Sequence, residues 1–194
     1  MVTKKIVVFA SGSGSNFEAI VAQLQGRVCE VALLVCDQPG AGCLERADRL
    51  GIPYAIVDRK KFAKTLTPGR AEYEAAIVKL LEPINPDLIV LAGYMRIVGP
   101  TLLDAYPSKI INIHPSLLPA FPGLDGIGDA LAHGVKVLGV TVHRVDAGVD
   151  TGPILDQAAL HTRDGETQSQ VTERIHQLEH QLYPQVIKQL LAAS

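Results

Sequence analysis

The chain has 194 residues, of which 47% are hydrophobic and 20% are charged, and its formal net charge is -2. This length and apolar content predict one globular domain with a core large enough to cover both faces of a sheet. The balanced charge and the absence of any Lys/Arg block exclude an electrostatic footprint for nucleic acid or an anionic membrane, so we expect small-molecule partners.

The N-terminal segment does not have the pattern of a targeting sequence. Its apolar run from Ile6 to Ala10 is shorter than a signal peptide requires, and no run approaches the ~20 apolar residues of a membrane span. Cys29, Cys36 and Cys43 match neither a zinc pair nor a disulfide framework. We interpret them as buried small side chains in a reducing compartment and expect a cytoplasmic protein.

Strands and helices alternate along the first half of the chain. Short β-branched runs without polar alternation predict strands buried on both faces of a sheet, at residues 5–10, 31–37, 54–58 and 87–93. Runs with helical spacing predict the connecting helices, at residues 17–24, 44–50 and 69–81. This alternation favours an open, mostly parallel α/β sheet of Rossmann type.

The second half of the chain continues this sheet differently. An apolar strand leads into residues 111–114, and a short helix is expected near 129–133. No helix separates the strand-like runs 137–145 and 153–160, which predicts an antiparallel C-terminal strand pair and a mixed sheet. A long C-terminal helix is predicted for about residues 166–191.

A loop of glycine, serine and asparagine at residues 11–16 joins the first strand to the first helix. Backbone N–H groups and the helix dipole favour a phosphate at such a junction. The two glycines fit the start of a dinucleotide fingerprint, but Phe17 stands at its third glycine position, which weighs against NAD or FAD. The polar side chains suit a compact terminal phosphate, and they equally suit an ordinary helix N-cap. The segment alone leaves both interpretations open.

Asn112 and His114 are two residues apart on one strand, so their side chains point to the same face. Both can donate hydrogen bonds to a carbonyl oxygen that becomes an oxyanion, and a carboxylate from another loop can keep the imidazole protonated. This is acyl transfer without a protein nucleophile. Ser116 does not lie on a nucleophile elbow, and the histidines lack zinc-binding spacing. An Asn-x-His pair alone is also compatible with a histidine that only packs in the core.

Several stretches together resemble a known family. N-I-H-P-S-L-L-P at 112–119 and V-D-T-G-P at 149–153 are similar to the formyltransferase family that uses 10-formyltetrahydrofolate. The loop 11–16, with 93–97 and 140–143, resembles the branch of that family that formylates glycinamide ribonucleotide in purine synthesis. The resemblance extends over nearly the whole chain.

The resemblance implies a role for each of these stretches. Asn112 and His114 would polarise the formyl carbonyl, and Asp150 would keep His114 protonated and relay the proton through water. The residues that would hold the ribonucleotide phosphate and ribose are Gly14, Ser15, Asn16 and Glu179. The residues that would line the folate pocket are Arg70, Met95, Arg96, Ile97, Val98, Asn112 and Val149, with Arg70 at the glutamate tail.

The formyl-folate would be a co-substrate, and the resemblance implies no metal. We expect a single domain, monomeric or homodimeric, with a phosphate-binding half at about 1–100 and a folate and catalytic half at about 101–194. Asp125 stands where some relatives carry a histidine, so we leave it out of the catalytic set, and His176 also departs from the residue type expected near the phosphate.

Three other functions share part of this pattern. A formyltetrahydrofolate hydrolase has the same core and usually an N-terminal regulatory domain. A methionyl-tRNA formyltransferase needs a further RNA-binding domain and a basic surface. A catalytically silent nucleotide-binding module would need the glycine loop but none of the residues Asn112, His114 and Asp150.

Overall fold

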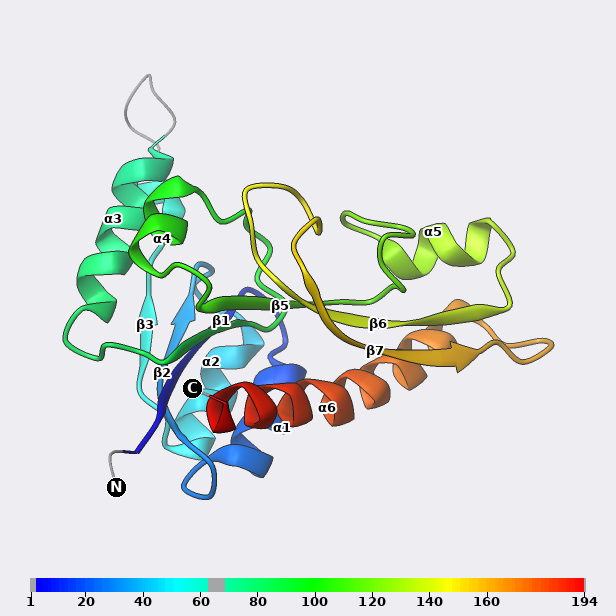
Figure 1. The fold of residues 1–194 in the computed structure, drawn as a ribbon, viewed down its shortest axis with the longest axis horizontal. Coiled ribbons are helices and arrows are strands. Elements are labelled where there is room, and N and C mark those ends of the chain that lie inside the picture. The colour runs from blue at the N-terminus through cyan, green and yellow to red at the C-terminus, as the bar shows by residue number, and fades with distance from the viewer. Residues whose placement is uncertain (1–2, 63–68, 194) are drawn as a thin grey trace.

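The computed structural model describes residues 3–62 and 69–193, and within these residues seven strands form one sheet in the order β3-β2-β1-β4-β5-β6-β7 (Figure 1). The strands are β1 (Lys5–Ala10), β2 (Glu30–Cys36), β3 (Tyr54–Ile56), β4 (Leu88–Leu91), β5 (Ile110–His114), β6 (Val137–Arg144) and β7 (Ile154–His161). The first five run parallel, β6 is antiparallel to β5, and β7 is antiparallel to β6. The predicted mixed sheet with an antiparallel C-terminal pair is confirmed.

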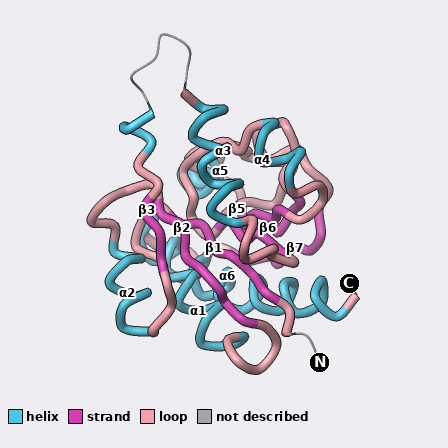
Figure 2. The backbone as a smooth tube through the Cα atoms, turned by 90° about the vertical axis from the view of Figure 1, so that its left-hand side faces the viewer, coloured by secondary structure: helices cyan, strands magenta, loops and turns pink. Residues whose placement is uncertain are grey.

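Helices cover both faces of the sheet. They are α1 (Ser15–Leu24), α2 (Gly42–Leu50), α3 (Arg70–Leu81), α4 (Pro100–Ala105), α5 (Gly126–Ala132) and α6 (Gln168–Ala192), with a 3₁₀ turn at Arg59–Phe62. Helices α3 and α4 lie on one side, and α1, α2 and α6 lie on the other (Figure 2). Each side has its own cluster of buried apolar residues, as expected when a parallel sheet is covered on both faces.

Three predicted elements have different bounds in the structure. The strand expected at 54–58 is β3, which has only three residues at the edge of the sheet. The helix expected at 129–133 begins at Gly126, because the Asp125 carboxylate accepts a hydrogen bond from the Gly128 amide at 2.9 Å and caps it. Helix α6 begins after Thr167, which forms a capping box with Gln170.

Helix α6 is fastened to the two strands that lead into the site. The buried hydroxyl of Tyr183 donates to the carbonyl of Leu91 on β4 at 2.8 Å and to that of Ile111 on β5 at 3.2 Å. Burial raises the pKa of Tyr183 well above its ordinary value, so the hydroxyl keeps its proton and remains a donor. The C-terminal ends of β1, β4 and β5 are neighbours, where ligands bind in open α/β sheets.

The three cysteines are buried and form no disulfide, which confirms their interpretation as core residues. The Cys43 thiol lies 3.6 Å from the Cys36 sulfur, and this hydrogen bond lowers the pKa of Cys36 to about 7. No helix in the described part of the chain is both long enough and apolar enough to cross a membrane.

Candidate active site

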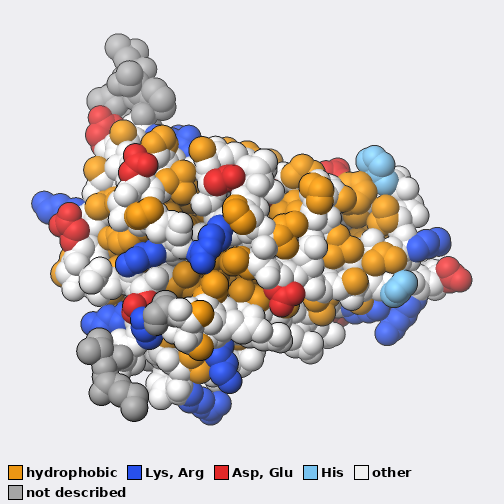
Figure 3. Space-filling view, viewed as in Figure 1, with side chains coloured by type: hydrophobic (Ala, Val, Ile, Leu, Met, Phe, Trp, Pro, Cys, Tyr) orange, Lys and Arg blue, Asp and Glu red, His pale blue; other side chains and the backbone are white. Residues whose placement is uncertain are grey.

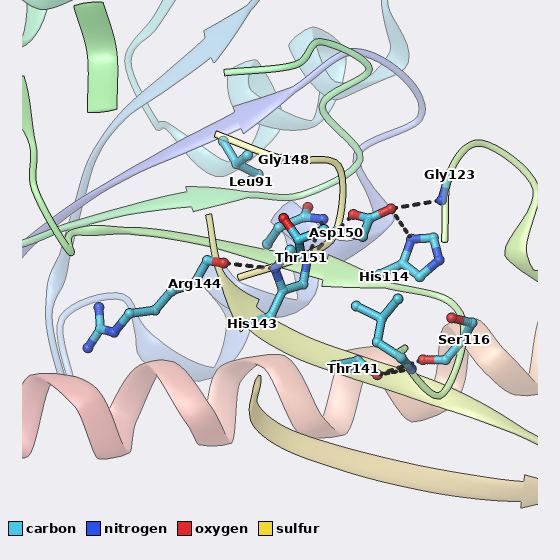
Figure 4. A network of polar contacts seen from close by, with 12 residues as sticks. Leu91, His114, Ser116, Gly123, Thr141, His143, Arg144, Gly148, Asp150 and Thr151 are labelled. Carbon is cyan, nitrogen blue, oxygen red and sulfur yellow. Dashed lines mark hydrogen bonds and ion pairs between the residues drawn. The ribbon is translucent and has the colours of Figure 1, made fainter. Parts of the chain in front are cut away.

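Polar side chains from three segments meet where β5 ends beside β6. Asn112 and His114 lie on β5, and Asp150 comes from the loop between β6 and β7. Figure 4 shows His114, His143 and Asp150 side by side. Asp150 Oδ2 is 3.5 Å from His114 Nδ1, and Asp150 Oδ1 is 3.5 Å from Nε2 of His143 on β6. The structure therefore brings the three predicted catalytic residues together and adds His143 to them.

The buried His143 orients the amide of Asn112. The two residues are direct partners in the β5–β6 ladder, and Asn112 Nδ2 is 3.2 Å from His143 Nε2. His143 Nδ1 is 2.8 Å from the Arg144 carbonyl, which can only accept, so Nδ1 carries a proton. In the neutral ring, Nε2 then accepts from Asn112 and makes no hydrogen bond to Asp150. The second N–H of Asn112 is then left for a ligand. Sequence reasoning missed His143, because only the strand register places it opposite Asn112.

His114 is buried, and its two ring nitrogens have different partners. Nε2 lies 2.8 Å from the Phe121 carbonyl and donates to it, while Nδ1 faces Asp150. The start of α5 approaches this ring closely, because a Cβ on Gly126 would lie 3.0 Å from His114 Nε2 and 3.2 Å from the Phe121 oxygen. The ring edge that carries Nε2 is therefore occupied by Phe121, and the edge that carries Nδ1 faces the Asp150 carboxylate.

Asp150 is held in an unfavourable backbone conformation. Its φ is 55°, in the left-handed region that residues with a Cβ seldom adopt. Its Oδ2 accepts a hydrogen bond from the Gly123 amide at 2.9 Å, and its side chain is only 12% exposed. The carboxylate thus lies between the loop before α5, which donates one hydrogen bond to it, and the two histidines, which face it at 3.5 Å.

A cleft of about 400 Å³ opens beside this centre. The predicted folate-pocket residues that line it are Met95, Arg96, Ile97, Val98, Asn112 and Val149, together with His114, His143 and Asp150. Met95 is 66% exposed and Leu124 is 97% exposed at its edge, an unusual position for apolar side chains unless a ligand or partner covers them. Figure 3 shows apolar side chains gathered over the part of the molecule formed by β6, β7 and α5. The volume suits a small organic molecule.

The two predicted folate-binding arginines lie differently from each other. Arg96 lines the cleft, and its Nε donates to the buried Asp37 at 2.6 Å. Arg70 is not among the described residues that line the cleft. It donates from Nη2 to the Ile97 carbonyl at 3.1 Å and from Nε to the buried Glu74 at 3.3 Å. Arg70 is therefore joined to the cleft wall through the Ile97 carbonyl, and its contact with the glutamate tail stays a prediction.

The predicted phosphate and ribose residues form a separate group at the start of α1. Gly14 has a φ of 78°, and a Cβ there would lie 2.6 Å from the Cβ of Cys43, so the position requires glycine. No side chain among the described residues caps α1, which removes the ordinary N-cap interpretation and leaves its first backbone N–H groups for an anion.

Asn16 is instead paired with α6, where its Nδ2 donates to Glu179 Oε2 at 2.9 Å. Burial raises the pKa of Glu179, and the hydrogen bond from Asn16 opposes that rise. The neighbouring Arg46 donates from Nε to the Ser13 carbonyl at 2.8 Å. The start of α1 thus has a cation beside it and a carboxylate facing it from α6.

Three residues that the sequence left aside have identifiable positions. The Ser116 hydroxyl donates to the Ala120 carbonyl at 2.6 Å within the turn after β5, and Asp125 caps α5. His176 stacks on His180 with ring centroids 6.5 Å apart on α6. Within the described ranges, no group of three or more His, Cys, Asp or Glu side chains could hold a metal ion.

Comparison with known proteins shows the family of the chain. The formyl transferase family profile matches residues 4–187. Phosphoribosylglycinamide formyltransferase of Bacillus subtilis is 53% identical over 190 residues, covering 97% of this chain and 95% of the relative. The chain belongs to the phosphoribosylglycinamide formyltransferase family.

Solved structures of this formyltransferase family share the whole fold. Phosphoribosylglycinamide formyltransferase from Bacillus halodurans has a TM-score of 0.91 at 47% identity, over 97% of this chain and 96% of that one. Glycinamide ribonucleotide transformylase 1 from Geobacillus kaustophilus has a TM-score of 0.91 at 51% identity, over 97% of this chain and 99% of that one. A trifunctional purine biosynthetic protein of Drosophila melanogaster is 38% identical, and the chain spans 14% of its length. The family therefore occurs both alone and within longer chains.

Proposed function

We propose that this enzyme of purine biosynthesis transfers the formyl group of 10-formyltetrahydrofolate to the amine of glycinamide ribonucleotide in the cytoplasm. The products are formylglycinamide ribonucleotide and tetrahydrofolate. The observation that carries the proposal is the convergence of Asn112, His114 and Asp150 at the end of an apolar cleft, separate from the uncapped start of α1. A cleft for a folate and a helix start for a phosphate suit two substrates that meet between them.

In this mechanism, the second N–H of Asn112 and the Nδ1–H of His114 donate to the formyl oxygen. The substrate amine attacks the formyl carbon and forms the new C–N bond, and the negative charge moves to the oxygen. Collapse of this intermediate breaks the bond between the formyl carbon and N10 of the folate. Asp150, which faces His114 Nδ1, passes the proton from the amine through water to N10.

The remaining predicted residues bind the two substrates. Met95, Ile97, Val98 and Val149 would contact the folate ring, and Arg96 would receive its carboxylates, with Arg70 near the glutamate tail. Gly14, Ser15 and Asn16 would hold the phosphate, and Glu179 would accept hydrogen bonds from the ribose hydroxyls. We propose that both sets belong to one domain, with the phosphate set in about residues 1–100 and most of the catalytic set in about 101–194. A monomer or homodimer stays a prediction.

The test mixes the purified protein with glycinamide ribonucleotide and formyl-folate and follows folate absorbance. Consumption of the donor that depends on the amine supports the transferase. Consumption without the amine, with release of formate, would instead favour formyltetrahydrofolate hydrolysis, which the names of the close relatives do not favour. Replacing the ribonucleotide by methionyl-tRNA tests the sister reaction, for which we expect no turnover.

A further inference from the structure

The loop that presents Asp150 is closed by a second carboxylate, that of Asp146. Asp146 Oδ1 accepts a hydrogen bond from the Thr151 hydroxyl at 2.7 Å and another from the Gly148 amide at 3.0 Å. Thr151 follows Asp150 directly, so these two hydrogen bonds join the segments before and after the catalytic carboxylate.

The packing of the loop makes this closure tight. A Cβ on Gly148 would lie 2.0 Å from Thr151 Oγ1, so the threonine hydroxyl occupies the space that a side chain would take. A Cβ on Gly152 would lie 1.9 Å from the Arg144 carbonyl oxygen, so the end of the loop packs closely against the end of β6. Both glycines therefore permit the contacts that bring Thr151 onto Asp146.

The backbone at Asp150 needs such support. Aspartate enters the left-handed region more often than most residues with a Cβ, but a φ of 55° still has an energetic cost that surrounding contacts must offset. Outside the loop, Asp150 has one hydrogen bond from Gly123 and two contacts of 3.5 Å with the histidines. The two histidine contacts, at 3.5 Å, are too long to fix the carboxylate by themselves.

We propose that Asp146 and Thr151 form a positioning pair that holds Asp150 against His114, an inference that rests on the proposed function of Asp150. Neither residue touches the reacting atoms. Loss of the pair lets the loop relax toward ordinary backbone angles, and Asp150 Oδ2 then moves away from His114 Nδ1 and from the Gly123 amide.

The first test compares Thr151→Val, which keeps the side-chain shape, with Thr151→Ser, which keeps the hydroxyl. We expect Thr151→Val to lower kcat roughly tenfold with little change in KM for glycinamide ribonucleotide, because a displaced catalytic group acts mainly on the transition state. Thr151→Ser should stay within about twofold of wild type. Asp146→Asn should keep most activity, because an amide oxygen also accepts, whereas Asp146→Ala should match Thr151→Val.

Two controls separate positioning from general damage. Thr162→Val removes a hydroxyl that donates to the Lys136 carbonyl at 3.4 Å at the far end of β6 and β7, and it should leave kcat unchanged. In an Asp150→Asn background, Thr151→Val should cause no further loss, because the pair acts through Asp150. An additive further loss, or equal losses in Thr151→Val and Thr162→Val, would overturn the proposal.

Hydrogen exchange of the Gly123 amide gives a readout that does not need turnover. We expect this amide, which donates to Asp150, to exchange roughly tenfold faster in Thr151→Val than in wild type or Thr151→Ser. Unchanged exchange would contradict the positioning role even if transferase activity is found. Faster exchange in a protein that never formylates glycinamide ribonucleotide would instead leave the positioning pair standing and refute the proposed function.

Discussion

Replacing Asn112 by alanine removes one of the two donors that we assign to the formyl oxygen. Removal of one oxyanion-stabilising donor lowers kcat by roughly 10²–10³-fold, or about 2.7–4 kcal/mol of transition-state stabilisation. The KM for the formyl donor should change little, because the lost interaction strengthens only in the transition state.

The same substitution has a separate, smaller effect on folding. It removes the 3.2 Å hydrogen bond to the buried Nε2 of His143, which we expect to cost about 1–3 kcal/mol of unfolding free energy. That leaves a folded protein, given the ordinary stability of about 5–15 kcal/mol. Thermal melting of the variant shows whether it is folded at the temperature of the kinetic assay.

Two matched variants sharpen the result. Asn112→Asp keeps the shape of the side chain but replaces the donating amide by an acceptor, so its kcat should fall as far as that of Asn112→Ala. Ser116→Ala removes a buried hydroxyl close to the site that donates only to the Ala120 carbonyl in the turn after β5. The kcat of this variant should stay within about twofold of wild type. A folded Asn112→Ala enzyme with nearly wild-type kcat would refute the reasoning.

Three further changes test other parts of the site. Asp150→Asn should lower kcat by roughly 10²–10⁴-fold and alter the pH–rate profile, and an unchanged profile would argue against a proton relay. Gly14→Ala places a Cβ 2.6 Å from that of Cys43, so KM for glycinamide ribonucleotide should rise while KM for the formyl donor does not. Glu179→Gln should raise KM for glycinamide ribonucleotide roughly tenfold. Because burial raises the pKa of Glu179 above 4.5, the wild type loses stability as pH rises through that raised pKa. The melting temperature of Glu179→Gln should therefore rise relative to that of the wild type as the pH increases towards neutral. Below pH 4.5 the difference between the two melting temperatures should not change.

The sequence predicts the sheet because its strands are apolar runs bounded by turns, and local patterns of that kind need no long-range information. Helix α4 was not predicted, since six residues beginning at Pro100 carry too little helical periodicity. The early start of α5 depends on the capping hydrogen bond of Asp125, a role that was not predicted for that residue.

Residue patterns alone predicted the part of the site whose residues lie close together in the chain, and the family resemblance supplied the rest. Asn112 and His114 are two apart on one strand, and the resemblance supplied Asp150. His143 lies in the stretch 140–143 that carries the resemblance, but it received no role, because the β5–β6 register is what places it opposite Asn112. Arg70 was predicted to meet the glutamate tail of the folate, and with its hydrogen bonds to Glu74 on the same helix and to the Ile97 carbonyl that role stays a prediction. The contact with Ile97 joins segments 27 residues apart and has no local signature.

Transfer of a labelled formyl group tests the central claim most directly. The formyl carbon of the folate is labelled with a carbon isotope, and the label is followed by NMR in the presence of glycinamide ribonucleotide and the wild-type enzyme. We predict that the label appears in the amide of the ribonucleotide product as fast as the donor is consumed, and that His114→Ala slows both together. Label that appears in formate, at a rate independent of the ribonucleotide, would contradict the account.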